Sequence, residues 1–344
     1  MKRLNKQTTA MAGLVFLGMN TALAEPLYVG SYGGSTEQAM RDEIIPACLE
    51  EHEAEIIYVA GNSTDTLAKL QAQRGNQELD VVLMDDGPMY QAINLGFCSP
   101  MQNTAMLDDV YDIARFPDDK AVGVGLVASG FAYNAEMFER NGWEPPSSWN
   151  DLADEKFADK LVVPSISNTY GVHALVMAAR LNGGGESDID PGFIFMQEEA
   201  APNILSFEPS AGKMSELFQN EEIALSVWGS GRLRALANTG FPGAFAYPEE
   251  GAVALMVAGC VIEGSEEREL AEAFVEHLLT PESQELLADT QGWGPAQRNA
   301  ELSDDLAEIL PYGEKVDQLV TVDWDVINPN RLEWTNRWNR QVER

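Results

Sequence analysis

The stretch Leu27-Tyr-Val-Gly-Ser-Tyr-Gly-Gly-Ser35 is a short apolar run that ends in a polar turn containing two glycines. Residues 36–51 follow with apolar side chains at near-helical spacing, which predicts a helix directly after the turn. Two further strand-like runs, residues 55–60 and 80–84, are each followed by another polar turn and another helical pattern. This βαβαβ alternation predicts a parallel sheet with right-handed crossovers.

The turns after these three predicted strands are candidate binding sites. Ligands of open parallel sheets bind beyond the carboxyl ends of the strands. Such turns offer backbone N–H groups and short polar side chains to a ligand. The candidate residues in them are Ser31, Tyr32, Gly33, Asn62, Ser63, Asp85 and Asp86.

The same alternation restarts in the second part of the chain. Residues 161–164 and 223–227 are strand-like, and each run leads through a polar turn into a helical pattern. A further turn over residues 245–251 precedes a long apolar run. These turns add the candidate site residues Ser167, Asn168, Trp228, Ser230, Arg232 and Tyr247.

Two long apolar runs, residues 122–134 and 252–262, can carry the chain from one unit to the other and back. We therefore expect an α/β protein of two lobes, each a mainly parallel sheet flanked by helices, joined by two hinge strands. The predicted boundaries are lobe 1 over residues 25–131 and 255–310, lobe 2 over residues 132–254, and a C-terminal helical segment over residues 311–344.

The N-terminus has the order of a secretory signal peptide. Lys2, Arg3 and Lys6 precede an apolar run over residues 10–19, and Ala22-Leu-Ala24 then supplies a small-residue cleavage site. A lipoprotein signal needs a cysteine just after the apolar run, and the first cysteine is Cys48. We expect residues 1–24 to be removed and the mature protein to be soluble in the periplasm.

The chain is strongly acidic, with 22 Lys and Arg, 55 Asp and Glu, and a formal net charge of −33. Such a charge argues against nucleic acid or an anionic membrane surface as a partner. It is typical of a solvated acidic surface, and it says little about the charge of a pocket.

The three cysteines, Cys48, Cys98 and Cys260, allow at most one internal disulfide in an oxidising compartment, and the sequence does not select the pair. They show no C-x-x-C spacing, and the three histidines are scattered along the chain, so we predict no metal site. A ferric site built from two neighbouring tyrosinates is disfavoured, because none of the nine tyrosines is adjacent to another.

Catalytic signatures are absent from the sequence. It has no G-x-S-x-G, no G-x-x-x-x-G-K-[ST] and no H-E-x-x-H, so nothing supports the alternative of an exported hydrolase. The glycines after Tyr32 lack the third glycine of a dinucleotide-binding loop. We therefore expect a binding protein without a cofactor.

The candidate residues support opposite ligand charges. Asp85 and Asp86 either bind a cation or cap a helix, while Trp228 and Tyr247 would offer aromatic faces to apolar stems or cations. Arg232 instead anchors a carboxylate or phosphonate, or it pairs with surface acids. The sequence alone leaves both charges open.

With these residues in view, the chain resembles the extracellular solute-binding proteins of ABC importers, and within them the branch that contains spermidine/putrescine-binding proteins. The matching segments are residues 28–34, 67–74, 80–87, 226–231 and 246–251, together with the tryptophans Trp324, Trp334 and Trp338. The resemblance covers nearly the whole mature chain. It implies a type II periplasmic-binding-protein fold, a hinge-bending monomer without catalysis, and delivery of a small molecule to a membrane permease that has a cytoplasmic ATPase.

The resemblance implies a polyamine-like organic cation as ligand, although the site departs from the usual pattern. Polyamine binders usually present aromatic residues in the first and third turns and an acid near the tryptophan. Here the first turn has one aromatic residue, Tyr32, the third has Asp85 and Asp86, and Arg232 lies near Trp228. The alternatives are an anionic or zwitterionic ligand, such as an aminophosphonate or an organic acid, and ferric ion.

Overall fold

The computed structural model describes residues 26–52, 54–208 and 210–343. The predicted signal peptide therefore lies outside the described residues. Within them, no helix is both long enough and apolar enough to cross a membrane.

The strands alternate with helices along most of the chain. The strands are β1 (Leu27–Tyr32), β2 (Ile56–Gly61), β3 (Val81–Asp85), β4 (Val122–Asn134), β5 (Leu161–Val163), β6 (Ile204–Phe207), β7 (Leu225–Gly229), β8 (Gly243–Ala246), β9 (Ala252–Val261) and β10 (Leu319–Val320). The helices are α1 (Ser35–Ala39), α2 (Ile45–Glu51), α3 (Ser63–Ala72), α4 (Asp86–Asn94), α5 (Ala135–Asn141), α6 (Thr169–Leu181), α7 (Asp190–Phe195), α8 (Ala211–Gln219), α9 (Ser230–Ala237), α10 (Arg268–Leu278), α11 (Pro281–Gln291), α12 (Asp304–Ile309) and α13 (Trp324–Gln341).

In the described chain these strands form one sheet, in the order β2-β1-β3-β9-β4-β7-β5-β6, with β10 beside β9 and β8 beside β4. Strand β1 pairs in parallel with β2 and β3, and β5 pairs in parallel with β6 and β7. The central pair, β4 and β9, is antiparallel. The sheet thus has a parallel part at each end and an antiparallel pair between them.

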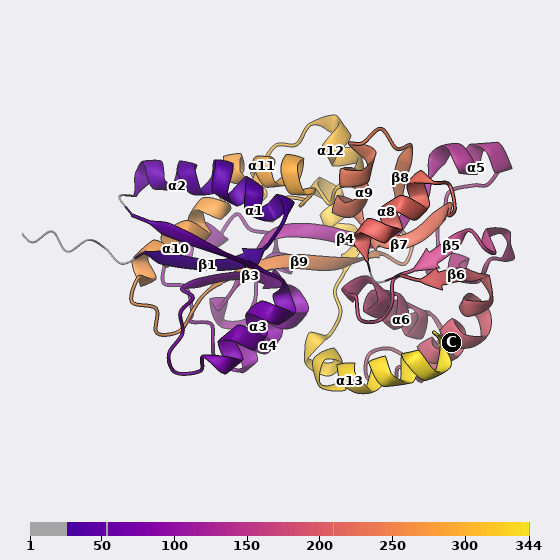
Figure 1. Cartoon of the computed structure of the whole chain (residues 1–344), viewed down its shortest axis with the longest axis horizontal. Helices are drawn as coiled ribbons and strands as arrows, with labels where there is room; N and C mark the ends of the chain where they lie inside the picture. Colours follow the sequence, from indigo (N-terminus) through magenta and orange to yellow (C-terminus); the bar gives the residue numbers. More distant parts are fainter. Residues whose placement is uncertain (1–25, 53, 209, 344) are drawn as a thin grey trace, which may run out of the picture.

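The molecule has two lobes (Figure 1). Lobe 1 contains β1, β2 and β3 with α1 to α4, α10 and α11, and lobe 2 contains β5 to β8 with α5, α6, α8 and α9. Strands β4 and β9 run through the middle and connect the lobes, and nearly every residue in them is buried. The predicted two-lobe α/β fold is confirmed.

Several short elements were not predicted. They are β6, β8 and β10 with helices α5, α7, α8 and α12. Strands β6 and β8 have four residues each, none of them fully buried, and the prolines close to both ends of each mark these regions as loops in the sequence.

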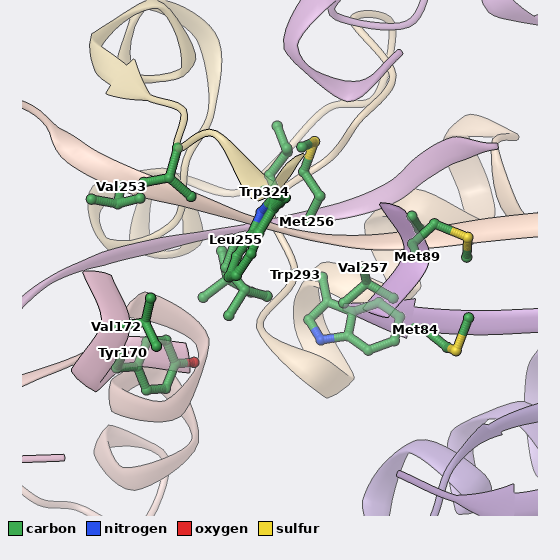
Figure 2. Close-up of a cluster of buried hydrophobic side chains, with 14 of the residues drawn as sticks. Met84, Met89, Tyr170, Val172, Val253, Leu255, Met256, Val257, Trp293 and Trp324 are labelled. Carbon is green, nitrogen blue, oxygen red and sulfur yellow. The ribbon is translucent and has the colours of Figure 1, made fainter. Parts of the chain in front are cut away.

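One hydrophobic core extends through both lobes. Figure 2 shows its centre, where Leu255, Met256 and Val257 of β9 lie near Trp293 and Trp324. Trp324 is the first residue of α13, so the C-terminal helix is anchored in this core.

A disulfide joins Cys98, which follows α4, to Cys260 in β9, with 5.7 Å between their Cα atoms. Cys48 lies buried in the core of lobe 1. The sequence had left this pairing open.

Candidate functional site

A cavity of about 720 Å³ lies between the two lobes. Nine of the predicted site residues line it: Tyr32, Gly33, Asn62, Ser63, Asp85, Ser167, Asn168, Trp228 and Arg232. They lie at or just beyond the carboxyl ends of strands in both lobes, where the rule for parallel strands predicts a ligand.

Helix N-termini from both lobes open onto this cavity. Residues of the first turns of α3, α6 and α9 are among its lining. Asn62 and Asn168 cap α3 and α6 with their side chains, accepting hydrogen bonds from the backbone N–H groups of Asp65 and Tyr170. The positive ends of these helix dipoles favour a negatively charged group in the cavity.

Asp85 is the one acidic residue among the described residues that line the cavity. The Tyr32 hydroxyl donates a hydrogen bond of 2.6 Å to Asp85 Oδ1, and the Asp85 backbone N–H donates to Ser63 Oγ at 3.0 Å. Burial raises the pKa of Asp85, and the hydrogen bond from Tyr32 acts in the opposite direction. Burial and then the Asp85 charge raise the pKa of Tyr32 well above its usual value, so Tyr32 remains a neutral donor.

Two arginines also line the cavity, and their positive charges act to lower the pKa of Asp85 against the effect of burial. Arg232 lies in the first turn of α9, and Arg331 lies in α13. Among the described residues, neither guanidinium has a carboxylate oxygen within 4.0 Å. Burial lowers the pKa of Arg331, whereas the Asp85 and Asp86 charges raise it.

The structure does not bring Ser31 and Asp86 to the cavity. Both side chains are buried, with 1% and 2% of their surface exposed. Neighbouring side chains of a strand point to opposite faces, so Ser31 points away from Tyr32. Asp86 Oδ1 accepts the Gly87 backbone N–H at 3.1 Å, and burial raises the Asp86 pKa to about 7.

Ser230 and Tyr247 also lie away from the cavity lining. Ser230 Oγ accepts a hydrogen bond of 3.1 Å from the Ala128 backbone N–H, which ties the start of α9 to β4. The Tyr247 hydroxyl donates to the Ile309 carbonyl at 2.9 Å, and its ring packs against Phe245. The expected aromatic wall therefore lacks Tyr247.

Trp228 lines the cavity but offers little of its ring to it. Only 3% of the residue is exposed, and the ring stacks on Phe218 with 5.8 Å between the centroids. Its aromatic face is thus largely taken up by the core of lobe 2.

The cavity lining also includes residues that were not predicted from the sequence, most notably Asn328, Arg331 and Thr335 of α13. Arg331 follows Trp324 by seven residues and precedes Trp334 by three. In a helix this spacing places the three side chains on one face. The two tryptophans were a usable signal that this face turns inward.

One serine–histidine pair bears on the hydrolase alternative. His173 Nδ1 and Ser129 Oγ are 2.8 Å apart, yet both residues are fully buried and neither lines the cavity. Burial lowers the pKa of His173 to about 3. A base with such a pKa and no access to substrate is not suited to hydrolysis. In addition, no group of three or more His, Cys, Asp or Glu among the described residues could hold a metal ion.

Comparison with known proteins identifies a family that this chain matches. A family model described as "Bacterial extracellular solute-binding protein" matches residues 43–309. "Iron uptake protein A1" of Synechocystis is 25% identical over 274 residues, covering 74% of this chain and 71% of its own length. A Salmonella paratyphi A protein named "Putative 2-aminoethylphosphonate-binding periplasmic protein" is 22% identical over 295 residues, covering 83% of this chain and 82% of its own.

Two solved structures illustrate the similarity in fold. An ABC transporter structure from Clostridium perfringens superimposes with a TM-score of 0.80 at 21% identity, covering 92% of this chain and 99% of the other. The periplasmic binding protein AfuA from Actinobacillus pleuropneumoniae, with fructose-6-phosphate bound, gives a TM-score of 0.72 at 19% identity, covering 92% and 98%.

Proposed function

Since this chain belongs to the bacterial extracellular solute-binding proteins, we propose that it is the periplasmic binding component of an ABC importer and captures a small organic acid between its lobes. The proposed ligand has an acidic group, such as a phosphonate, phosphate ester or carboxylate, that lies against Arg232. A hydrogen-bond donor on the same ligand, an ammonium or a hydroxyl, lies against Asp85.

The observation that carries this proposal is the lack of a carboxylate partner for both cavity arginines. The chain has 55 acidic and 22 basic residues, so an arginine finds an acid easily on its surface. Arg232 and Arg331 nevertheless form no ion pair within the described part of the chain. Guanidinium groups bind carboxylate and phosphate by two parallel hydrogen bonds, which suits an acid that arrives from outside.

Two further features agree with an acidic ligand. The N-terminal turns of α3, α6 and α9 direct positive dipole ends at the cavity. One similar protein is named for 2-aminoethylphosphonate, and the solved structure of AfuA has fructose-6-phosphate bound; we transfer that chemistry here as part of the proposal.

The geometry favours an acid over the polyamine that the sequence resemblance implied. Of the features expected to bind a cation, Asp86 and Tyr247 lie outside the cavity lining and Trp228 is stacked on the core. Asp85 remains, and two arginines lie near it. A polyamine would meet more positive than negative charge there.

The test is a thermal-shift screen of the purified protein, followed by titration calorimetry. The compounds are 2-aminoethylphosphonate, fructose 6-phosphate, citrate, spermidine, putrescine and Fe³⁺. A ligand at one hundred times its Kd stabilises the folded state by about 2.7 kcal/mol, so the screen is sensitive to it. We expect an acid to raise the melting temperature, and Arg232→Ala to abolish the shift. A shift with spermidine, putrescine or Fe³⁺ alone would contradict the proposal.

A further inference from the structure

We propose that α13 forms part of the binding site, with Arg331 as the second anion-binding residue beside Arg232. This inference rests on the proposed function and deepens it. Helix α13 begins at Trp324, beyond the segment over which the family model matches, so the family match assigns no binding role to it.

Arg331 occupies a position on α13 that belongs to the buried face of the helix. The buried residues of α13 are Trp324, Ile327, Trp334 and Trp338. Their spacing of three, seven and four forms one apolar stripe, and residue 331 falls in its gap at an interval of four from Ile327 and three from Trp334. An apolar side chain is the usual occupant of such a position, and here it is an arginine that lines the cavity.

Helix α13 is held against lobe 1 by side-chain hydrogen bonds and a close packing contact. Asn328 Nδ2 donates to the Gly87 carbonyl at 2.9 Å, and Gln91 Nε2 donates to Asn328 Oδ1 at 3.0 Å. A Cβ atom at Gly87 would lie 2.9 Å from the Trp324 ring, so the glycine permits this close approach. These contacts dock the N-terminal part of α13 onto α4.

Helix α13 is also held against lobe 2, by contacts of two of its arginines. The Arg337 guanidinium pairs with Asp190 of α7, a helix that packs on α6 of lobe 2, and it lies over the Phe193 ring. Arg331 itself approaches the Ile166 and Ser167 carbonyls at 3.5 and 3.4 Å, which are long distances for hydrogen bonds. Helix α13 thus bridges both lobes, and Arg331 lies at the junction with most of its donors unused.

An enclosed guanidinium without a carboxylate partner costs stability in the empty protein. Such a cost is typical of a residue whose partner is a ligand. Removing Arg331 should therefore weaken ligand binding without lowering the stability of the unliganded protein. Removing an arginine with a structural role would lower that stability.

The experiment compares Arg331→Gln, Arg331→Lys and the control Leu332→Ala, a neighbouring position on the same helix with 74% of its surface exposed. Calorimetry uses 2-aminoethylphosphonate, fructose 6-phosphate and citrate, and thermal unfolding is recorded without ligand. We expect Arg331→Gln to raise the Kd of the bound acid at least tenfold, Arg331→Lys to raise it less, and Leu332→Ala to leave it unchanged. The unliganded melting temperature of Arg331→Gln should equal or exceed that of the wild type.

The outcomes separate the two proposals. If Arg331→Gln binds the acid like the wild type while Arg232→Ala does not, the role of α13 is refuted and the proposed function stands. If Arg331→Gln loses binding together with unliganded stability, Arg331 is structural and the inference also fails. If the wild type binds none of the three acids, both proposals are overturned.

Discussion

At the scale of single residues, the site depends on which way neighbouring side chains point. Asp85 faces the cavity and receives the Tyr32 hydroxyl, whereas Asp86 is buried beside Trp324. Asp85 Oδ1 is occupied by Tyr32, so the other carboxylate oxygen is the one to receive a donor from a ligand.

Asp85→Asn should therefore discriminate between ligands with and without an amine. A hydrogen bond to a charged group contributes about 1.5–3 kcal/mol, so the variant should bind 2-aminoethylphosphonate roughly tenfold or more weakly. Ethylphosphonate, which lacks the amine, should bind the variant at least as tightly as the wild type. Calorimetry with both compounds measures this, and an equal loss for both would mean that Asp85 only orients Tyr32.

Asp86→Asn should change how stability depends on pH. Burial raises the Asp86 pKa to about 7 in the folded state, so between its ordinary value of 3.8 and about 7 the folded protein binds more protons than the unfolded chain. The free energy of unfolding then falls as pH rises through this range, by at most about 1.4 kcal/mol per pH unit from this group.

Denaturant unfolding at pH 4.5 and pH 7 measures this effect. Asparagine has nearly the same shape without the charge, so the variant should gain stability relative to the wild type at pH 7 more than at pH 4.5. An equal difference at both values would show that Asp86 is not the group responsible.

Which turns line the cavity was predictable from the sequence, but the direction of each side chain was not. The rule that places ligands beyond strand ends selected the turns that contain Tyr32, Asn62, Asp85 and Asn168. The rule does not predict which of two neighbouring side chains, Tyr32 or Ser31 and Asp85 or Asp86, faces the cavity. The direction of each side chain depends on strand register and on the helices that pack against the sheet. Arg331 was missed because it lies in the interior of helix α13 and not in the turn that follows a strand.

At the scale of elements, the chain is easiest to predict where burial is complete. Strands β4 and β9 are long, apolar and almost fully buried, and the predicted limits of β4 match the structure. Strands β6 and β8 were missed because they are only four residues long and have prolines close to both ends, which is typical of loops. The pairing of Cys98 with Cys260 depends on the position of β9 beside β3, which no local pattern reports.

Replacing both Cys98 and Cys260 with alanine should lower stability without changing binding. The disulfide closes a loop between residues 162 positions apart, and loss of a native disulfide typically costs about 2–5 kcal/mol. Neither cysteine lines the cavity, so the Kd of the bound acid should stay within a factor of about two. Denaturant unfolding and calorimetry on the double variant check both parts, and the reduced wild type serves as a control. A large loss of affinity would show that lobe 1 transmits strain to the cavity.

At the scale of the whole molecule, the cavity lies between lobes that β4 and β9 connect. Ligands bound between two connected lobes commonly draw them together, because contacts to both sides form only in the closed arrangement. The acid that binds should therefore reduce the radius of gyration in small-angle scattering and be recovered chemically unchanged.

The matched control for this prediction is Arg232→Ala with the same acid, which should leave the scattering curve unchanged. Compaction of the variant as well would mean that the solute acts on the protein nonspecifically. An unchanged curve for the saturated wild type would show that the two lobes bind without closing.

The position of β9 in the sheet also affects how the newly made chain acquires its structure. Strand β9 lies between β3 and β4, although β3 ends at Asp85 and β9 begins at Ala252. Strand β9 begins 167 positions after β3 ends, so β3 lacks its second neighbour until those residues have been made, and its edge is open to other partners in that interval. The strands of lobe 2 all lie before β9 in the chain, so they are complete before the core of lobe 1 can close. The nascent protein should thus assemble its second lobe first, against the usual order from N-terminus to C-terminus.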